Sequence, residues 1–216
     1  MYLPEIFEET RPDVLWDLVS RRPLGLLVTA GPEGPMASPL PFLRREAEGR
    51  PVLAAHMARA NPHVAALAEG MDALVIFQGA DAYVTPGWYP SKAETGKVVP
   101  TWNYEMVQVQ GRLRLHAGAD WLAGQVADLT DAQEAARARP WAASDAPADF
   151  LAAQLRAIVG LEVEITRIRG KWKMSQNRPL ADMAGVAHGL ADPQDPHHDP
   201  AAAALVAERL AARQRP

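Results

Sequence analysis

Short segments in which every second residue is hydrophobic recur along the chain, separated by glycine and proline. A period of two is typical of a β-strand with one buried face. In residues 161–169, Leu161, Val163 and Ile165 alternate with polar residues, which predicts a half-buried strand. The same reasoning predicts about seven strands in all. They span residues 24–29, 36–43, 51–56, 72–77, 82–85, 104–115 and 161–169.

The predicted strands follow one another closely, mostly without the long helices that connect parallel strands. This spacing favours an antiparallel barrel over a doubly wound sheet, so the expected class is mainly β with helices. Gly-Pro-Glu-Gly at residues 31–34 predicts a turn. In the strand that follows, Pro39 and Pro41 lack the N–H that a central strand needs, so we expect an edge or bulged strand.

Helices are predicted from capping residues and from apolar spacing near 3.6. Thr10 and Asp13 form a capping pattern, and Asn61 before Pro62 is typical of a helix start. A second capping pattern at Thr130 predicts a break in the helix there. The predicted helices span residues 10–21, 61–68, 120–138, 147–157 and 201–213. We expect a domain of residues 1–190 with a helical insertion at about 119–157, followed by a linker and C-terminal helix at 191–216.

The composition narrows the class of protein. With 216 residues, 48% of them hydrophobic, the chain can bury one large core. It has no cysteine, which excludes disulfides, a thiol nucleophile and a cysteine metal site. We see neither a signal peptide nor the roughly 20 apolar residues that a membrane span needs, so we expect a cytoplasmic protein. The net charge of -4 argues against a broad nucleic-acid surface.

Residues 56–63, His-Met-Ala-Arg-Ala-Asn-Pro-His, form the first candidate binding segment. They run from the end of a predicted strand into the start of a capped helix. The free N–H groups and partial positive charge of a helix N-terminus, next to the Arg59 guanidinium, suit a phosphate group. The alternative is that Asn61 only caps the helix, Arg59 is solvated and His56 is a hydrogen-bonded core histidine.

Residues 99–104, Val-Pro-Thr-Trp-Asn-Tyr, form the second candidate segment. On a strand, Trp102 and Tyr104 share one face and Asn103 lies on the other. Aromatic and amide surface of this kind suits a planar ligand. The alternative is that the two aromatic residues belong to the core.

Residues 170–178, Gly-Lys-Trp-Lys-Met-Ser-Gln-Asn-Arg, form the third candidate segment, which we call the late motif. It directly follows the predicted strand at 161–169 and mixes cations, amides, a hydroxyl and aromatic surface. This mixture predicts a binding segment held by a scaffold. The alternative is a solvated basic face.

Other chemistry finds little support. His197, His198 and Asp199 are neighbours in a proline-rich segment, and neighbouring residues rarely converge on one metal ion, so we interpret them as linker. Phosphate-binding loops, dinucleotide fingerprints, nucleophile elbows and zinc-binding helices are absent from the sequence. Nothing therefore indicates nucleotide hydrolysis or a serine hydrolase.

Taken together, the motifs resemble the PaiB family of FMN-binding negative transcriptional regulators, from residue 1 to about 190. Met-Tyr-Leu-Pro at the start, Phe-Gln-Gly-Ala-Asp-Ala-Tyr-Val-Thr-Pro at 77–86 and Gly-Val at 185–186 add to the resemblance. It implies a split β-barrel related to pyridoxamine-phosphate oxidases, with two subunits sharing two flavin sites. The chain departs from the expected pattern at Gln108, where a histidine is expected.

The resemblance also implies FMN as cofactor and a set of residues that bind it. The residues implied near the phosphate and ribityl chain are His56, Ala58, Arg59 and Asn61. The remaining signature positions are Trp102, Asn103, Lys171, Lys173, Ser175, Gln176, Asn177 and Arg178, which contact either the flavin or a second ligand.

The leading hypothesis is a homodimeric FMN-binding protein, either a flavin-linked regulator or an oxidoreductase of an unidentified small molecule. A direct DNA-binding repressor is the alternative suggested by the family name, although the helices at 120–157 are acidic and we find no helix-turn-helix pattern. Haem binding or degradation is a further alternative, because related split barrels include such proteins. Its candidate ligands by residue type are His56, His63, His116 and His188.

Overall fold

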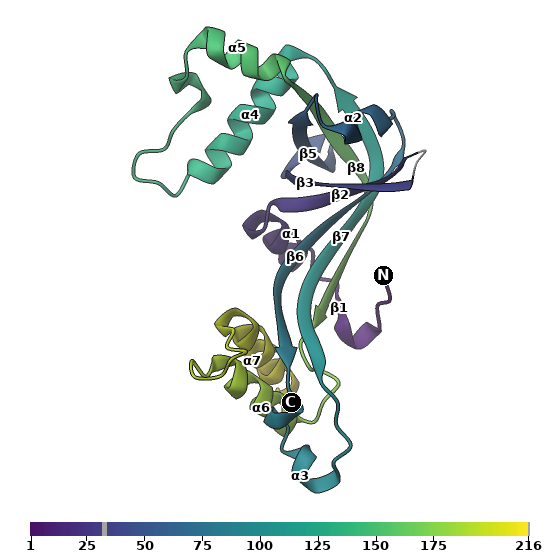
Figure 1. Cartoon of the computed structure of the whole chain (residues 1–216), viewed down its shortest axis with the longest axis vertical. Coiled ribbons are helices and arrows are strands. Elements are labelled where there is room, and N and C mark those ends of the chain that lie inside the picture. Colours follow the sequence, from purple (N-terminus) through teal and green to yellow (C-terminus); the bar gives the residue numbers. More distant parts are fainter. Residues whose placement is uncertain (32–33, 216) are drawn as a thin grey trace. The chain divides into compact units, whose positions relative to one another are not determined.

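The computed structural model describes residues 1–31 and 34–215, and a mainly antiparallel sheet is its largest feature (Figure 1). Its strands are β1 (Glu8–Glu9), β2 (Leu24–Gly31), β3 (Gly34–Pro41), β4 (Leu43–Ala47), β5 (Arg50–Ala58), β6 (Asp72–Val84), β7 (Thr101–His116) and β8 (Ile158–Lys173). They follow the order β3-β2-β6-β7-β8-β5-β4, and β1 pairs with β8. The predicted class, mainly β with helices, is confirmed.

The α-helices are α1 (Pro12–Arg21), α2 (Pro62–Ala66), α3 (Ser91–Thr95), α4 (Ala119–Glu134), α5 (Ala148–Arg156), α6 (Leu180–Ala191) and α7 (Pro200–Gln214). Short 3-10 turns, η1 (Glu5–Phe7), η2 (Pro86–Trp88) and η3 (Ala143–Asp145), complete the described elements. The predicted helical insertion corresponds to α4, η3 and α5, and the predicted C-terminal helix to α7. In the described part of the chain, we find no helix long and apolar enough to cross a membrane.

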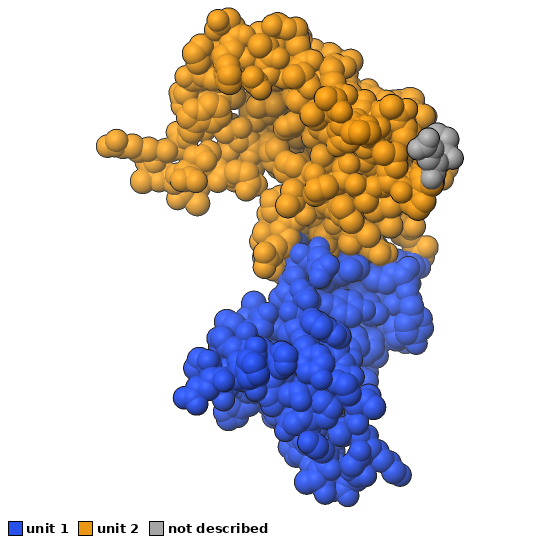
Figure 2. Space-filling model, in the orientation of Figure 1, with its two compact units in different colours: residues 1–18, 78–107, 169–216 blue, residues 19–77, 108–168 orange. Residues whose placement is uncertain are grey.

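The chain divides into two compact units (Figure 2). Unit 1 contains residues 1–18, 78–107 and 169–216, and unit 2 contains residues 19–77 and 108–168. The strands β6, β7 and β8 contribute residues to both. The division at residue 190 expected from the sequence stays a prediction.

Several local predictions hold. β3, which contains Pro39 and Pro41, is an edge strand, because it stands at the end of the sheet and, among the described strands, pairs with β2 alone. α2 starts as predicted, with the Asn61 side chain accepting a hydrogen bond from the His63 N–H and with Pro62 in the first turn. The turn predicted at residues 31–34 includes residues 32 and 33, which lie outside the described residues.

The two strands predicted at 72–77 and 82–85 are one strand, β6. The strand continues through the polar residues between them, where Gly79 has a packing role. A Cβ at Gly79 would lie 2.1 Å from Oε1 of Glu105, so glycine leaves room for this buried carboxylate. Oε1 of Glu105 accepts a hydrogen bond from the Ala80 N–H at 3.1 Å, and this contact supports the backbone through the polar stretch.

β8 differs from the prediction at both ends. It continues to Lys173, so the late motif starts inside the strand rather than after it. Residues 159–163 are buried on both faces, whereas the alternation predicted one polar face. Glu162, for example, is only 7% exposed, because the Trp121 Nε1–H donates to its carboxylate at 3.3 Å and His116 Nε2 lies 3.0 Å from it.

Two helix predictions are wrong. α4 passes through Thr130 without a break, because Leu122, Gln125 and Leu129 give it one continuous buried face. α6 occupies residues for which the sequence pattern predicts no helix. Its buried Met183, Val186 and Leu190 have helical spacing.

Each unit has its own buried residues. In unit 2, Leu27, Leu53, Val75 and Leu161 are fully buried, and the rings of Phe42 and Phe77 lie edge to face with centroids 5.8 Å apart. In unit 1, α6 and α7 lie against each other, and the core includes Trp172, Met174, Met183 and Val206. The late motif therefore contributes two core residues, Trp172 and Met174.

Candidate functional site

In unit 2, the first candidate segment leads from β5 into α2. Ala58 and Arg59 are exposed, and the carbonyl of Ala58 accepts a hydrogen bond from the Asn61 N–H at 2.9 Å. The Arg59 N–H donates to the carbonyl of Ala157 at 2.8 Å, and Nε of its side chain donates to the carbonyl of Arg156 at 2.9 Å. Arg59 is therefore held at Nε, while its outer guanidinium nitrogens have no hydrogen-bond partner among the residues that the structure describes.

His56 and His63 have opposite surroundings. Nε2 of His63 lies 2.8 Å from the Thr29 hydroxyl, and Nδ1 lies 2.8 Å from the Ser38 hydroxyl. Nδ1 of His56 is buried and has no hydrogen-bond partner in the described part of the chain. Burial lowers the pKa of both histidines, which favours the neutral rings. His63, not His56, is thus the satisfied core histidine.

Asn61 stabilises the start of α2 as its N-cap. Its Oδ1 accepts from the His63 N–H at 2.9 Å, and its Nδ2 lies 3.4 Å from the Ser38 hydroxyl. α2 has five residues, and Pro62 in its first turn has no N–H. Because the cap and the proline leave few free N–H groups, the cationic group that this segment offers is mainly Arg59. The assignment of Asn61 to the flavin stays a prediction.

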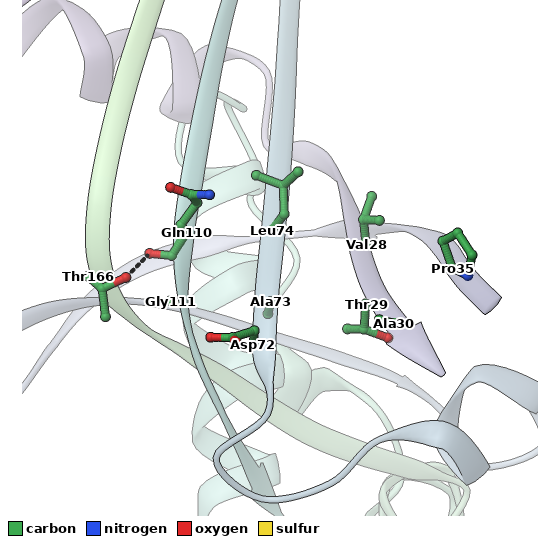
Figure 3. Close-up of a pocket in the computed structure, with 10 residues that line it drawn as sticks. All are labelled: Val28, Thr29, Ala30, Pro35, Asp72, Ala73, Leu74, Gln110, Gly111 and Thr166. Carbon is green, nitrogen blue, oxygen red and sulfur yellow. Dashed lines mark hydrogen bonds between the residues drawn. The ribbon is translucent and has the colours of Figure 1, made fainter. Parts of the chain in front are cut away.

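Unit 2 also has a hollow of about 510 Å³ beside the ends of several strands (Figure 3). Its lining includes the small residues Ala30 and Ala73, and Thr29 connects it to His63 through a hydrogen bond. The Thr166 hydroxyl donates to the carbonyl of Gln110 at 3.2 Å across one side, as the dashed line in Figure 3 shows. No feature of the sequence pattern pointed to this surface, because its residues come from five strands.

In unit 1, the strand alternation around Trp102 is as predicted, but the aromatic face is the exposed one. Trp102 is 52% exposed, and Tyr104 is half-buried, whereas Asn103 is fully buried. Nδ2 of Asn103 donates to the Ser175 hydroxyl at 3.0 Å. The alternative in which both aromatic residues belong to the core is therefore wrong for Trp102.

The two lysines of the late motif are engaged by nearby groups. Nζ of Lys171, a 6% exposed residue, donates to the carbonyl of Tyr2 at 3.1 Å and lies 5.2 Å from the ring centroid of Tyr104. Nζ of Lys173 donates to the Thr101 hydroxyl at 2.6 Å and to the carbonyl of Trp102. Burial, together with the charges of Lys171 and Arg178, lowers the pKa of Lys173.

The turn that ends the late motif is held by its own side chains. Ser175 has a φ of 64° and bonds to Asn103, while Oε1 of Gln176 accepts from the Met174 N–H at 2.6 Å and Nε2 donates to the Trp172 carbonyl at 2.5 Å. Asn177 is exposed, and the Arg178 guanidinium lies 4.8 Å from the ring centroid of Tyr89. Ser175 and Gln176 thus shape the turn, and Asn177 and Arg178 lie at its accessible side.

The histidines proposed for haem differ in availability. His63 uses both ring nitrogens within the protein, and His116 stacks on Trp121 with centroids 4.1 Å apart while its Nε2 meets Glu162. Among these, only His56 has a buried nitrogen without a partner in the described residues. In that same part of the chain, we find no group of three or more acidic or histidine side chains that could hold a metal ion.

The fold is similar to that of several solved structures. The FAD and heme binding protein from Mycobacterium smegmatis aligns with a TM-score of 0.57 at 24% identity, covering 77% of this chain and 73% of the other. The flavocytochrome Anf3 from Azotobacter vinelandii aligns with a TM-score of 0.56 at 17% identity, covering 77% and 69%. These likenesses confirm the predicted fold, an antiparallel split barrel.

The sequence defines the family. Residues 1–167 match the family described as "Putative FMN-binding domain", and the chain belongs to that family. An uncharacterised protein of Emericella nidulans is 34% identical, with 88% of this chain and 90% of the relative covered. The Bacillus subtilis protein named "Protease synthase and sporulation protein PAI 2" is 29% identical, covering 91% and 92%. The predicted resemblance is thereby confirmed, and the chain is classed as a flavin-binding protein.

The family match includes only part of the predicted site. It covers the segment at 56–63 together with Trp102 and Asn103, and it ends before the late motif. The segment at 56–63 lies in unit 2, whereas Trp102, Asn103 and the late motif lie in unit 1. All twelve cofactor-binding assignments stay predictions.

Proposed function

We propose that this chain is a homodimeric FMN-binding protein that acts as a flavin-linked regulator or as an oxidoreductase of a small molecule. Its match to an FMN-binding family over residues 1–167 is the observation that carries the proposal. Within those residues, Arg59 has an exposed guanidinium that is fixed at Nε and open at its outer nitrogens. A guanidinium of this kind can donate two hydrogen bonds to two oxygens of a phosphate group.

The residues beside Arg59 also fit a ligand with hydrogen-bonding groups. Buried polar atoms normally have a partner, so the unpartnered Nδ1 of His56 favours a ligand or water at the end of β5. Because burial lowers the pKa of His56, the neutral ring offers one donor and one acceptor. FMN, with its phosphate and hydroxylated chain, has matching groups.

Bound FMN would supply one-electron and two-electron redox chemistry. In this proposal Arg59 holds the phosphate and His56 hydrogen-bonds the ribityl chain, while Ala58 and Asn61 keep the turn between β5 and α2 in shape. Trp102, Asn177 and Arg178 are proposed as direct contacts of the flavin or a second ligand. Lys173 acts indirectly, because its Nζ already donates to the Thr101 hydroxyl and the Trp102 carbonyl. Asn103, Lys171, Ser175 and Gln176 act indirectly, because their polar groups already bond within unit 1.

The homodimer is supported by one face of β2. Leu24 and Leu26, two residues apart on the strand, are 66% and 37% exposed, and Val28 on the same face lines the hollow of Figure 3. Adjacent apolar side chains of this kind are more stable when covered. A second subunit over this face would bury them. Light scattering of the purified protein measures its molar mass and so tests whether it is a dimer.

A regulatory role is supported by the relative named for protease synthesis and sporulation. The net charge of -4 argues against direct binding to DNA as the route. We propose that regulation is indirect, through a small molecule or a protein partner. Tight, sequence-selective binding to promoter DNA in a gel-shift assay contradicts this.

Absorbance spectroscopy tests the flavin proposal. The purified protein is expected to be yellow or to take up added FMN with a saturable change in the flavin spectrum. Arg59→Ala should weaken FMN binding about 10-fold to 100-fold, since a hydrogen bond to a charged group contributes about 1.5–3 kcal/mol. Arg139→Ala, at an exposed position of unit 2, is the matched control and should bind as the wild type does.

Two outcomes overturn this assignment. A protein that takes up no FMN contradicts flavin binding, and an Arg59→Ala variant that binds FMN like the control contradicts the role of Arg59. A haem Soret band that appears on addition of haemin and disappears in His56→Ala favours the haem alternative instead.

A further inference from the structure

A small hollow in unit 1 is bordered by three aromatic rings. Tyr83 of β6 lies edge to face with Trp102 of the neighbouring strand β7, with centroids 5.9 Å apart and planes at 74°. The imidazole of His197, from the segment between α6 and α7, lies 4.7 Å from the Tyr83 centroid. The hollow has about 190 Å³, and its lining also includes Asp81, His198 and Asp199.

The segment that carries His197 is held in place by hydrogen bonds. The Trp88 Nε1–H donates to Oδ2 of Asp195 at 3.1 Å, and Oδ1 of the same carboxylate accepts from the His197 N–H at 2.8 Å. The Asp199 N–H donates to the carbonyl of Leu190 at 2.9 Å. His197 is therefore part of a built turn, and the interpretation of 197–199 as simple linker is incomplete.

The chemistry of this hollow favours a cation. Aromatic faces attract ammonium groups, and Asp81 and Asp199 in the lining add negative charge. Oδ1 of Asp199 also accepts from the Ala202 N–H at 2.8 Å as the cap of α7. Unit 1 already contains this interaction, because Nζ of Lys171 lies 5.2 Å from the ring centroid of Tyr104 and 5.7 Å from that of Tyr2. By contrast, no cationic side chain of the described residues lies over the rings of Tyr83, Trp102 and His197. Nζ of Lys173 instead donates hydrogen bonds to the Thr101 hydroxyl and the Trp102 carbonyl.

We propose that this hollow, the aromatic box of Asp81, Tyr83, Trp102, His197 and Asp199, binds the ammonium group of an organic amine. Its 190 Å³ lies below the size of pockets that enclose whole drug-sized ligands, so it suits a head group rather than a ring system. A bare metal ion fits less well, since the described residues form no three-ligand group. The proposal gives the exposed Trp102 a ligand other than flavin and does not depend on flavin binding.

Choline and its uncharged isostere 3,3-dimethylbutan-1-ol test the proposal, because they differ mainly in charge. In a ¹⁵N–¹H NMR titration of the full chain, choline should shift the Trp102 indole signal saturably, with a dissociation constant at least about fivefold below that of the alcohol. Trp102→Ala should weaken choline binding at least about fivefold, as read from other shifted signals, while Trp102→Phe keeps part of the affinity. Asp81→Asn should weaken choline binding and leave the alcohol unaffected.

Trp141→Ala is the matched control, since Trp141 is 47% exposed and lies in unit 2. It should bind choline as the wild type does. Arg59→Ala should also keep choline binding, which separates this site from the proposed flavin site. Absence of saturable choline binding, equal affinity for the uncharged alcohol, or unchanged affinity in Trp102→Ala each overturns the proposal.

Discussion

Gly185→Ala is expected to lower the free energy of unfolding by about 3 kcal/mol, because the added methyl group has no space. Its Cβ would lie 2.0 Å from the carbonyl oxygen of Trp88 and 3.2 Å from the carbonyl carbon. These are backbone atoms, so no side-chain rotation relieves the overlap. Gly189, one turn later on α6, faces the indole of the same tryptophan, and its Cβ would lie 2.3 Å from the ring. Because Gly185 and Gly189 have no side chains, α6 can pack directly against Trp88.

Urea unfolding measures this effect, with Gly124→Ala as the matched control. Gly124 lies inside α4, and a Cβ there would meet nothing within 4 Å. Because glycine destabilises a helix interior, the control should become more stable by about 0.5–1 kcal/mol. The Gly185 variant should also lose about 6–12 °C in melting temperature. If both variants change stability in the same direction, α6 does not contact Trp88 as described.

Glu9→Gln is expected to cost about 3 kcal/mol at neutral pH, because Glu9 is a buried carboxylate with two arginine partners. It is 4% exposed, Arg11 donates to it from Nε at 2.9 Å and from Nη2 at 2.8 Å, and Arg209 donates from Nη2 at 2.6 Å. Burial by itself raises the pKa of Glu9, but the hydrogen bonds from Arg11 and Arg209 outweigh it and lower the pKa to about 2. The neutral amide would leave Arg209 without its counter-charge.

The same pKa predicts how stability depends on pH. A carboxylate with a lowered folded-state pKa stabilises the protein above its unfolded value, near 4.5, and this contribution is lost as the pH falls toward 2. Wild-type stability should therefore fall over this range more steeply than that of Glu9→Gln. Glu208→Gln is the matched control, since Glu208 also lies near Arg11, at 3.7 Å, but its side chain is 57% exposed. It should change stability by less than about 0.5 kcal/mol. Parallel pH profiles for wild type and Glu9→Gln would refute the assignment.

The sequence predicts those parts of the fold that depend on neighbouring residues. The capped start of α2 at Asn61 and Pro62 is local chemistry, and so is the exclusion of the proline-containing β3 from the centre of the sheet. The prediction fails where a distant residue decides. β6 continues through Gly79 because Glu105, on another strand, fills the space that a side chain would need.

The candidate site shows the same limit. His56 and His63 look alike in the sequence, yet Thr29 and Ser38 satisfy His63, whereas Nδ1 of His56 has no partner in the part of the chain that the structure describes. These two hydroxyls lie more than twenty residues away in the chain, so no local pattern could reveal them. The late motif is held by a scaffold, as the sequence predicts, but the burial of Lys171 and Trp172 depends on the N-terminal segment and the core of unit 1.

The pairing of β1 with β8 has a consequence for synthesis on the ribosome. Glu8 pairs with Lys171 and Glu9 with Gly170. β1 can therefore pair with β8 only after residues 170 and 171 have been synthesised. Until then Glu9 is exposed to water and lacks its ion pair with Arg209. The residues of unit 2 are complete by residue 168 and can begin to order earlier. We therefore expect substitutions at Glu9 to affect late folding and yield in cells more than the early collapse of the chain.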